Sequence, residues 1–167
     1  LLQQNEEWIS LTTESASIGK WEWILQTGEV KLDETWASLA GYTLKELEPV
    51  TIETWKSLLH PDDVSKFENA VEEHISGKKR IYDCELRLKH KDGHWLYILS
   101  RGKAIEWNRN NEPLRLVGTH IDITDRKAFE DSLVYQASLL SNVSDAVIAL
   151  DKNYHIASWN KAAERIY

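Results

Sequence analysis

The sequence predicts an α+β domain in which helices cover one face of an antiparallel sheet. Three features carry this prediction: a strand hairpin near the start, a series of capped helices after it, and a return to two-residue alternation in the second half. The expected order is two strands, four helices and three strands, so the sheet must be assembled from both ends of the domain.

The first hairpin is predicted over residues 19–32, "GKWEWILQTGEVKL". Thr27 and Gly28 separate two apolar runs, and glycine supplies the positive φ that a tight turn requires. This stretch therefore predicts two short antiparallel strands.

Three short helices are expected next, because each predicted start carries a polar capping residue. Asp33 precedes "ETWASLA", and Gly41 can end that helix. Thr43 and Glu46 have the spacing of a capping box, and Thr51 precedes "IETWKSLL".

A longer helix is predicted from "HPDD" at residues 60–63 to Gly77, with one apolar stripe formed by Val64, Phe67, Val71 and Ile75. The imidazole and two carboxylates at its start also suit a metal ion. However, carboxylates at a helix N-terminus are stabilised by free N–H groups and by the helix dipole. We therefore favour a capping role for Asp62 and Asp63 over a metal site.

The period then changes to two, which predicts strands. One dry face is formed by Tyr82, Cys84, Leu86 and Leu88. Residues 91–93, Lys-Asp-Gly, predict a turn, and "LRLVGTHIDI" predicts the last strand. The strand between them places Trp95, Tyr97 and Leu99 on one face and Leu96 and Ile98 on the other. Because both faces are apolar, a helix or a second chain is expected to cover the outer face.

Composition fits a globular protein, with 42% hydrophobic and 28% charged residues and a net charge of −7. The chain has no basic stripe, so nucleic acid is not an expected partner. The single cysteine, Cys84, excludes an intrachain disulfide and a Cys-rich zinc site and favours a reducing, cytoplasmic location. No apolar run suits a membrane span of about 20 residues, although the parent protein can still be anchored elsewhere.

An internal repeat indicates a tandem array. The stretch from Ser15 is similar to "SNVSDAVIALDKNYHIASWNKAAERIY", which begins 126 residues later at Ser141. The expected organisation is an N-terminal helix or linker at 1–13, a domain at 14–127, a linker helix at 128–142, and the truncated start of a second domain at 143–167.

As an ordered set, "GKWEWILQTGEV", "LAGY", "WKSLLHPDD", "KDGHWLYILSRG" and "LVGTHIDITDRK" resemble a PAS domain with its PAC region, of the subclass that carries a Trp and an HPDD signature. The resemblance implies a five-stranded antiparallel sheet of order 2-1-5-4-3, with helices on one face and a linker helix at each end. It also implies a pocket and a regulatory role. Such domains occur in sensor histidine kinases and diguanylate cyclases, often as homodimers beside further PAS or kinase domains.

The resemblance identifies the pocket candidates as His120, Cys84, Leu88, Ile98, Trp55 and Phe67. Haem is disfavoured, because the helix position that matches the iron-binding histidine of haem-containing members is Lys66. Flavin is disfavoured, because the Asn-Cys-Arg-Phe motif is absent and the positions that match the flavin-binding amides are Leu88 and Ile98. No cofactor or metal is therefore predicted, and an unidentified small ligand stays open.

Two interpretations of His120 remain. We favour a buried histidine bonded to a neighbouring backbone group. In the alternative, His120 is the polar anchor of an otherwise apolar ligand pocket.

The last strand runs into a charged helix with no Gly or Pro at the join. Asp122, Ile123 and Thr124 resemble the Asp-Ile-Thr motif that ends the family's domain, and either polar side chain can cap the helix. Five residues then follow a heptad spacing: Phe129, Leu133, Gln136, Leu140 and Val143. This pattern fits either a short coiled coil or an ordinary linker helix. In both cases a stiff join can act as a lever that transmits a change in the last strand.

The chain carries no catalytic motif, so the fragment is not expected to be an enzyme; the expected parent protein is a histidine kinase. Two functions stay open: a sensory module that relays a ligand- or partner-induced change, and a ligand-free dimerisation scaffold. The outer face of Trp95, Tyr97 and Leu99 would contact a partner or an N-terminal helix containing Trp8, Ile9 and Leu11. Pocket volume separates the two functions, and the absence of a cofactor signature favours the scaffold for this copy.

Overall fold

The chain is described from a computed structural model that covers residues 17–142 and 146–166. It divides after Thr124 into two compact units, and each is described by itself. The N-terminal helix predicted for residues 1–13, with Trp8, Ile9 and Leu11, lies outside the described residues.

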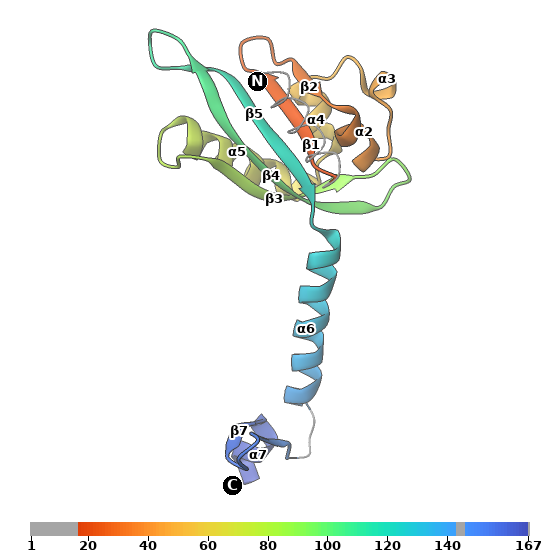
Figure 1. The fold of residues 1–167 in the computed structure, drawn as a ribbon, viewed down its shortest axis with the longest axis vertical. Coiled ribbons are helices and arrows are strands. Elements are labelled where there is room, and N and C mark those ends of the chain that lie inside the picture. Colours follow the sequence, from red (N-terminus) through yellow and green to blue (C-terminus); the bar gives the residue numbers. More distant parts are fainter. Residues whose placement is uncertain (1–16, 143–145, 167) are drawn as a thin grey trace, which may run out of the picture. The chain divides into compact units, whose positions relative to one another are not determined.

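The first unit is built on one five-stranded antiparallel sheet (Figure 1). Its strands are β1 (Gly19–Ile24), β2 (Val30–Leu32), β3 (Tyr82–Lys89), β4 (Trp95–Trp107) and β5 (Pro113–Asp122). Their order is β2-β1-β5-β4-β3, which confirms the predicted topology. Because β5 pairs with both β1 and β4, residues from the two ends of the domain share the centre of the sheet.

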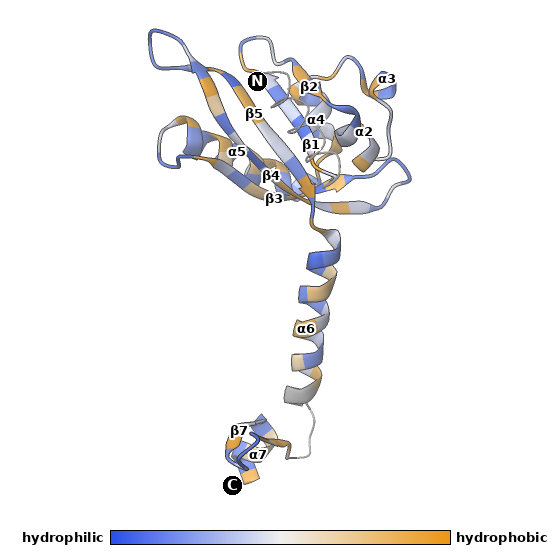
Figure 2. Ribbon diagram, in the orientation of Figure 1, coloured by the Kyte–Doolittle hydropathy of each residue, from blue (hydrophilic) through white to orange (hydrophobic). Residues whose placement is uncertain are grey.

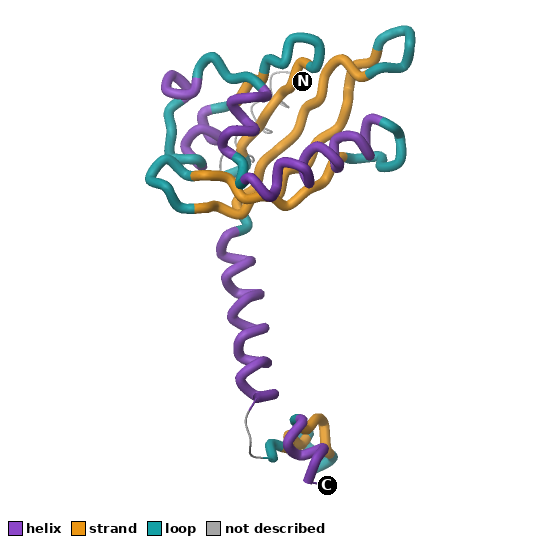
Figure 3. Tube along the Cα trace, turned by 180° about the vertical axis from the view of Figure 1, so that it is seen from behind, coloured by secondary structure: helices purple, strands orange, loops and turns teal. Residues whose placement is uncertain are grey.

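Four helices connect β2 to β3, and they lie across one face of the sheet (Figure 3). They are α2 (Glu34–Leu39), α3 (Leu44–Leu47), α4 (Ile52–Leu58) and α5 (Pro61–Ile75). The predicted caps of the three short helices are confirmed. Asp33 accepts the Trp36 N–H at 2.8 Å, Thr51 accepts the Thr54 N–H at 3.2 Å, and the Glu46 carboxylate accepts the Thr43 N–H at 2.9 Å.

The start of α5 differs from the prediction. His60 is the N-cap, and its Nδ1 accepts the Asp62 N–H at 3.3 Å. Asp63 instead binds Arg87 of β3 through two guanidinium hydrogen bonds of 2.8 and 2.9 Å and through the Arg87 backbone N–H at 2.8 Å. The capping role predicted for Asp63 is therefore wrong, because a bidentate guanidinium offers a carboxylate stronger hydrogen bonds than a helix end does. Hydrogen bonding to Arg87 holds the pKa of Asp63 below its usual value.

The core lies between the helices and the inner face of the sheet. Its most completely buried side chains include Trp36, Leu86, Leu88, Ile98 and Leu116. Leu86, Leu88 and Ile98 come from alternate positions of β3 and β4, as the two-residue period predicted. Burying a large apolar side chain of this kind contributes roughly 1.5–3 kcal/mol to folding.

The second unit consists of a helix and a small hairpin. Helix α6 (Thr124–Asn142) begins at the unit boundary, and only Ile123 separates it from β5. Apolar residues recur along α6 among polar ones (Figure 2). Strands β6 (Ile148–Leu150) and β7 (Ile156–Trp159) pair antiparallel, and α7 (Lys161–Ile166) follows. Among the helices of the described ranges, none is both long and apolar enough to cross a bilayer.

Candidate functional site

A small cavity lies between the inner face of the sheet and the helices. Its volume is about 30 Å³. Aromatic rings dominate its walls, which include Trp21, Trp23, Trp55, Phe67, Tyr82 and His120. A water molecule needs roughly 10–15 Å³ of such space, whereas a site for a drug-sized ligand has about 300–1,000 Å³. In this conformation the cavity of about 30 Å³ therefore has room for roughly two or three waters.

His120 is held at the cavity by side chains from two other elements. The register places it opposite Gly19 of β1 and Ser100 of β4. The Trp36 indole donates its N–H to Nδ1, and Nε2 lies 2.7 Å from the Ser100 hydroxyl oxygen. Its ring also stacks on Trp55, with 4.7 Å between ring centroids and 18° between planes. Its partners are thus side chains, so the expected backbone partner is wrong.

These contacts define the protonation state of His120. Because Nδ1 accepts a hydrogen bond, the ring hydrogen is on Nε2 and is donated to Ser100. Burial lowers the pKa of His120 from 6.5 to about 3. The imidazole is therefore neutral near pH 7, and the Ser100 hydroxyl retains its own hydrogen for another acceptor.

The remaining polar groups of the cavity wall are mostly donors. Among the described residues, the indole N–H groups of Trp21 and Trp23 are buried without a hydrogen-bond partner, and the Tyr82 hydroxyl faces the cavity beside Ser100. Burial raises the pKa of Tyr82, which keeps its phenol protonated. Unpaired buried donors cost free energy, roughly 1–3 kcal/mol each, unless an acceptor reaches them. The wall is thus suited to water or to a small group rich in acceptor atoms.

Trp21 is positioned by two glycines. Gly102 of β4 and Gly118 of β5 are partners in the register, and Gly118 also pairs with Trp21 of β1. A Cβ at Gly102 would lie 2.5 Å from the Trp21 ring, and one at Gly118 would lie 2.3 Å from it. The indole therefore lies directly on the backbone of the two strands, and no larger residue fits beneath it.

The structure brings together half of the predicted pocket residues. His120, Trp55 and Phe67 line the cavity. Cys84, Leu88 and Ile98 are buried elsewhere in the core, outside the cavity wall. Burial raises the pKa of the Cys84 thiol, which disfavours its reactive thiolate form.

Three of the five predicted transmission residues, Asp122, Ile123 and Thr124, lie together where β5 ends. The Ile123 N–H donates to the Tyr97 carbonyl at 2.8 Å, and the Tyr97 N–H donates to Thr124 Oγ1 at 3.0 Å. The Asp122 carboxylate accepts the Thr124 N–H at 2.8 Å, so Asp122 bonds the first residue of α6. The Thr124 side chain bonds β4 instead of capping the helix. Ile123 is buried, and the bonds to Tyr97 fix the end of β5 to the start of the neighbouring strand β4.

The other two predicted transmission residues and the predicted packing face of β4 are partly exposed. Phe129 and Leu133 on α6 are 66% and 50% exposed. The side chains of Leu140 and Val143 lie outside the described part of the chain, so the heptad stays a prediction. On the outer face of β4, Trp95, Tyr97 and Leu99 are each half-buried.

Sequence reasoning missed three polar contacts. Ser100 follows Leu96 and Ile98 on the inner face of β4, so the two-residue period places its hydroxyl inside. The Asp63–Arg87 pair joins residues 24 positions apart, which no local pattern indicates. His74 near the end of α5 is buried; its Nε2 accepts the Ala104 N–H at 2.9 Å, and its Nδ1 lies 2.9 Å from the Lys79 carbonyl oxygen.

Sequence comparisons agree with this fold. The family model described as the PAS fold matches residues 29–120. The hybrid signal transduction histidine kinase A of Dictyostelium discoideum is 39% identical over 72 residues, which are 42% of this chain and 3% of that protein. The probable diguanylate cyclase DgcE of Escherichia coli is 25% identical over 170 residues, covering 98% of this chain and 15% of that protein. The chain thus spans a small part of the length of these relatives.

A solved structure shows the same arrangement. The sensory box histidine kinase/response regulator from Burkholderia thailandensis superposes with a TM-score of 0.70 and 35% sequence identity. The match covers 79% of this chain and 96% of that one. Because the family model covers more than half of the chain and the strand order is the one the resemblance implied, this chain belongs to the PAS fold family.

Proposed function

We propose that this chain is a sensory and signal-relay module of a larger signal-transduction protein, a sensor histidine kinase. The observation that carries the proposal is the join between β5 and α6. Ile123 and Thr124 both bond the backbone of Tyr97 in β4, and only Ile123 separates the strand from the helix. A shift of β4 relative to β5 therefore displaces the first turn of the helix directly.

A relay of this kind needs two packings of similar free energy, which a ligand or partner then biases. The cavity restricts which ligands could bind inside the domain. Its volume of about 30 Å³ suits water or a very small molecule, and its N–H and O–H donors suit acceptor atoms. Haem and flavin remain disfavoured as ligands, because a cavity of this size has no room for a large ring system.

The second candidate is a ligand-free scaffold for dimerisation. The small cavity favours it, since no sizeable ligand is needed to complete the core. The half-buried Trp95, Tyr97 and Leu99 offer an apolar surface for a second copy of the chain. A second copy of the chain, or a neighbouring PAS or kinase domain, that packs on this surface would contact Tyr97, the β4 residue that bonds Thr124.

We further propose that residues 14–127 form a PAS domain with its PAC region, of the Trp and HPDD subclass, and that residues 128–142 form a signalling helix. Residues 143–167 are proposed as the start of a second PAS domain. In the first unit, Asp33 accepts the N–H groups of Lys20 and Trp36 at 3.0 and 2.8 Å. In the second unit, Asn160 accepts those of Val147 and Ala163, both at 3.0 Å. The same hydrogen-bonded hairpin and helix start thus recurs, which supports a repeated domain.

We assign the catalytic reaction, such as a kinase or cyclase reaction, to other parts of the full-length protein. The relatives that share this module are named as a kinase and a cyclase, and they extend far beyond the region of similarity. We place the module in the cytoplasm, where a reduced, buried Cys84 is stable and where kinase or cyclase substrates are available.

The proposal is tested by inserting Gly-Gly after Thr124 in the full-length protein. The insertion is expected to change kinase or cyclase output to the level of a protein that lacks residues 17–124, because flexible residues uncouple the strand from the helix. The same insertion after Asn110, in the exposed loop between β4 and β5, is the matched control and should keep wild-type output. Wild-type output from the Thr124 insertion, together with altered output from the deletion, would exclude the relay.

A further inference from the structure

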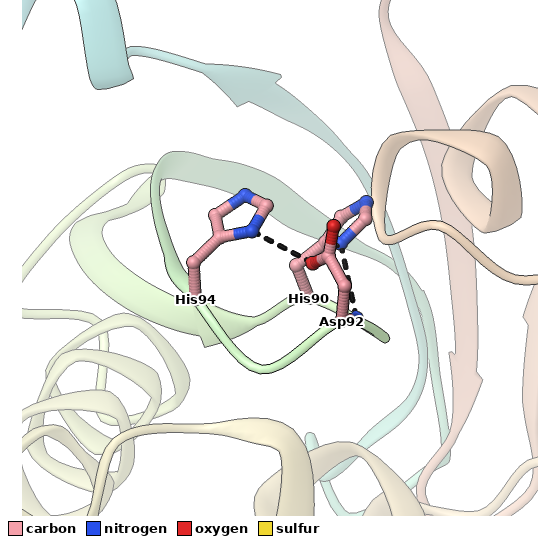
Figure 4. A group of neighbouring side chains, drawn as sticks. All are labelled: His90, Asp92 and His94. Atoms are coloured by element: carbon pink, nitrogen blue, oxygen red, sulfur yellow. Dashed lines mark hydrogen bonds and ion pairs between the residues drawn. The ribbon is translucent and has the colours of Figure 1, made fainter.

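The hairpin between β3 and β4 gathers three potential metal ligands (Figure 4). His90, Asp92 and His94 occupy alternate positions around the turn, and one ligand atom from each lies within 4.8 Å of the other two. The Asp92 carboxylate contacts Nδ1 of both histidines, and its distance from His94 Nδ1 is 2.7 Å. Within residues 17–142 and 146–166, no other group of three such residues is gathered this closely.

The backbone holds this group in place. The His90 N–H donates to the His94 carbonyl and the Gly93 N–H donates to the His90 carbonyl, both at 2.9 Å. Gly93 supplies the turn's positive φ of 99°. The turn is thus closed at both ends, which keeps the two histidines side by side with the carboxylate between them.

The helical layer supports one side of the hairpin. The Lys91 N–H donates to the Ala40 carbonyl at 3.0 Å, and the Lys91 ammonium pairs with Glu46. The His90 ring lies on Gly41, where an added Cβ would be 2.4 Å from Nε2. His90 therefore has a fixed position, and the ligand group is attached to the folded domain instead of to a free loop.

The polar atoms of the three side chains lie close to one another. His90 Nδ1 accepts the Asp92 N–H at 3.3 Å, so its lone pair points into the turn, yet the same atom contacts the Asp92 carboxylate. Two imidazole nitrogens and one carboxylate oxygen thus converge at the same turn.

We propose that His90, Asp92 and His94 form a surface site for a divalent transition-metal ion, with Zn²⁺ as the best match. Two imidazoles and one carboxylate are ligands that Zn²⁺ prefers, at bond lengths of about 2.0–2.2 Å. Three protein ligands leave a fourth position for water or for a group from another molecule.

Binding requires a modest rearrangement. The two imidazole rings are stacked, with centroids 4.4 Å apart and planes 23° from parallel, so one ring must rotate to direct its Nδ1 at a shared ion. The His94 side chain is 54% exposed and has room for this rotation, whereas His90 is packed on Gly41. His90 and Asp92 therefore form the fixed part of the site, and His94 closes it.

The position of the site suggests a signalling role for the ion. This role, unlike the binding site itself, rests on the proposed function. His94 immediately precedes β4, and Tyr97 of that strand bonds both Ile123 and Thr124. An ion that fixes His94 restricts the start of β4 close to the residue that holds the helix. Zn²⁺ would thus act as a second input at the surface, separate from the internal cavity.

The site is tested with the purified, tag-free chain, titrated with ZnCl₂ by calorimetry near pH 7. We expect one ion per chain and an affinity about tenfold or more weaker for both His94→Gln and Asp92→Asn. His155→Gln is the matched control, because His155 forms an exposed pair with Asp151 at 3.5 Å in the second unit and has no third ligand gathered beside it in the described ranges. It should bind Zn²⁺ as the wild type does.

Imidazole nitrogen NMR provides an independent measurement. Zn²⁺ should shift the Nδ1 resonances of His90 and His94 and leave those of His155 unchanged. Circular dichroism of each metal-free variant should match the wild type, since Asp92 and His94 are exposed. Equal affinity in wild type and Asp92→Asn, or unshifted Nδ1 resonances, would overturn the site and leave a hydrogen-bonded turn. Neither result depends on signalling, so the proposed function is tested separately.

Discussion

At the scale of single residues, His120 shows how packing determines charge. Its two nitrogens are bonded to Trp36 and Ser100, and its ring is stacked on Trp55. None of these partners is an anion that would stabilise an imidazolium, so burial alone decides the equilibrium and lowers the pKa to about 3. The neutral form is therefore part of the folded structure.

This pKa predicts a pH-dependent stability. The unfolded chain binds a proton at His120 below pH 6.5, whereas the folded chain does so only near pH 3. The contribution of His120 is therefore complete above pH 6.5 and is lost progressively as the pH falls toward 3. From pH 7 to pH 5 the free energy of unfolding should fall by about 2 kcal/mol, because each pH unit below 6.5 costs about 1.4 kcal/mol.

Urea unfolding of wild type and His120→Gln at both pH values measures this effect. Glutamine does not titrate. Between pH 7 and pH 5 the free energy of unfolding of the variant should therefore fall by about 2 kcal/mol less than that of the wild type, although the variant is less stable at pH 7. Identical changes with pH in the two proteins would contradict the assigned burial of the imidazole.

At the scale of elements, the junction of β5 and α6 depends on one hydroxyl. Thr124 Oγ1 accepts the Tyr97 N–H at 3.0 Å, and no methyl group can replace that acceptor. Thr124→Val is therefore expected to destabilise the junction by about 1 kcal/mol and, through more frequent local opening, to speed amide exchange at Tyr97 about fivefold. Hydrogen exchange measured by NMR checks this.

Thr124→Ser keeps the hydroxyl and is the control. Slow exchange at Tyr97 should return in this variant, because serine offers the same acceptor. Fast exchange in both variants would indicate that the methyl group of Thr124, and not its oxygen, holds the junction.

Most elements of the sheet and the helices could be predicted from local patterns. Gly28 determines the first turn, Asp33 and Thr51 cap their helices, and the two-residue period defines β3 and β4. These signals are local, because they depend on backbone conformation and on neighbours within a few residues. The strand order came from the family resemblance, since local patterns do not determine which strands pair.

The candidate site was predicted less completely for the same reason. The family resemblance placed His120 at the pocket, but its partners come from residues 84 and 20 positions away. The size of the cavity depends on how Trp21 packs on Gly102 and Gly118, which join three strands. Contacts between residues on different strands produce no periodic pattern in the sequence, so only the structure reveals them.

At the scale of the molecule, a destabilising substitution in one unit should leave the stability of the other unit unchanged. Asn160 accepts two N–H groups in the second unit, and Asn160→Ala removes both hydrogen bonds. We expect faster amide exchange at Val147 and Ala163, with unchanged exchange in β1 to β5. Asn160→Asp keeps an acceptor and should preserve slow exchange, and loss of protection in the first unit would contradict the division after Thr124.

The glycine pair beneath Trp21 has a mechanical consequence. A core usually absorbs a change in volume by rearranging side chains, but Gly102 and Gly118 have none to rearrange. Pressure on the indole from a molecule entering the cavity would therefore act on the main chain of β4 and β5 at their centre. Tyr97, near the start of β4, bonds Thr124, the first residue of the outgoing helix, so the sheet itself would carry the displacement outward.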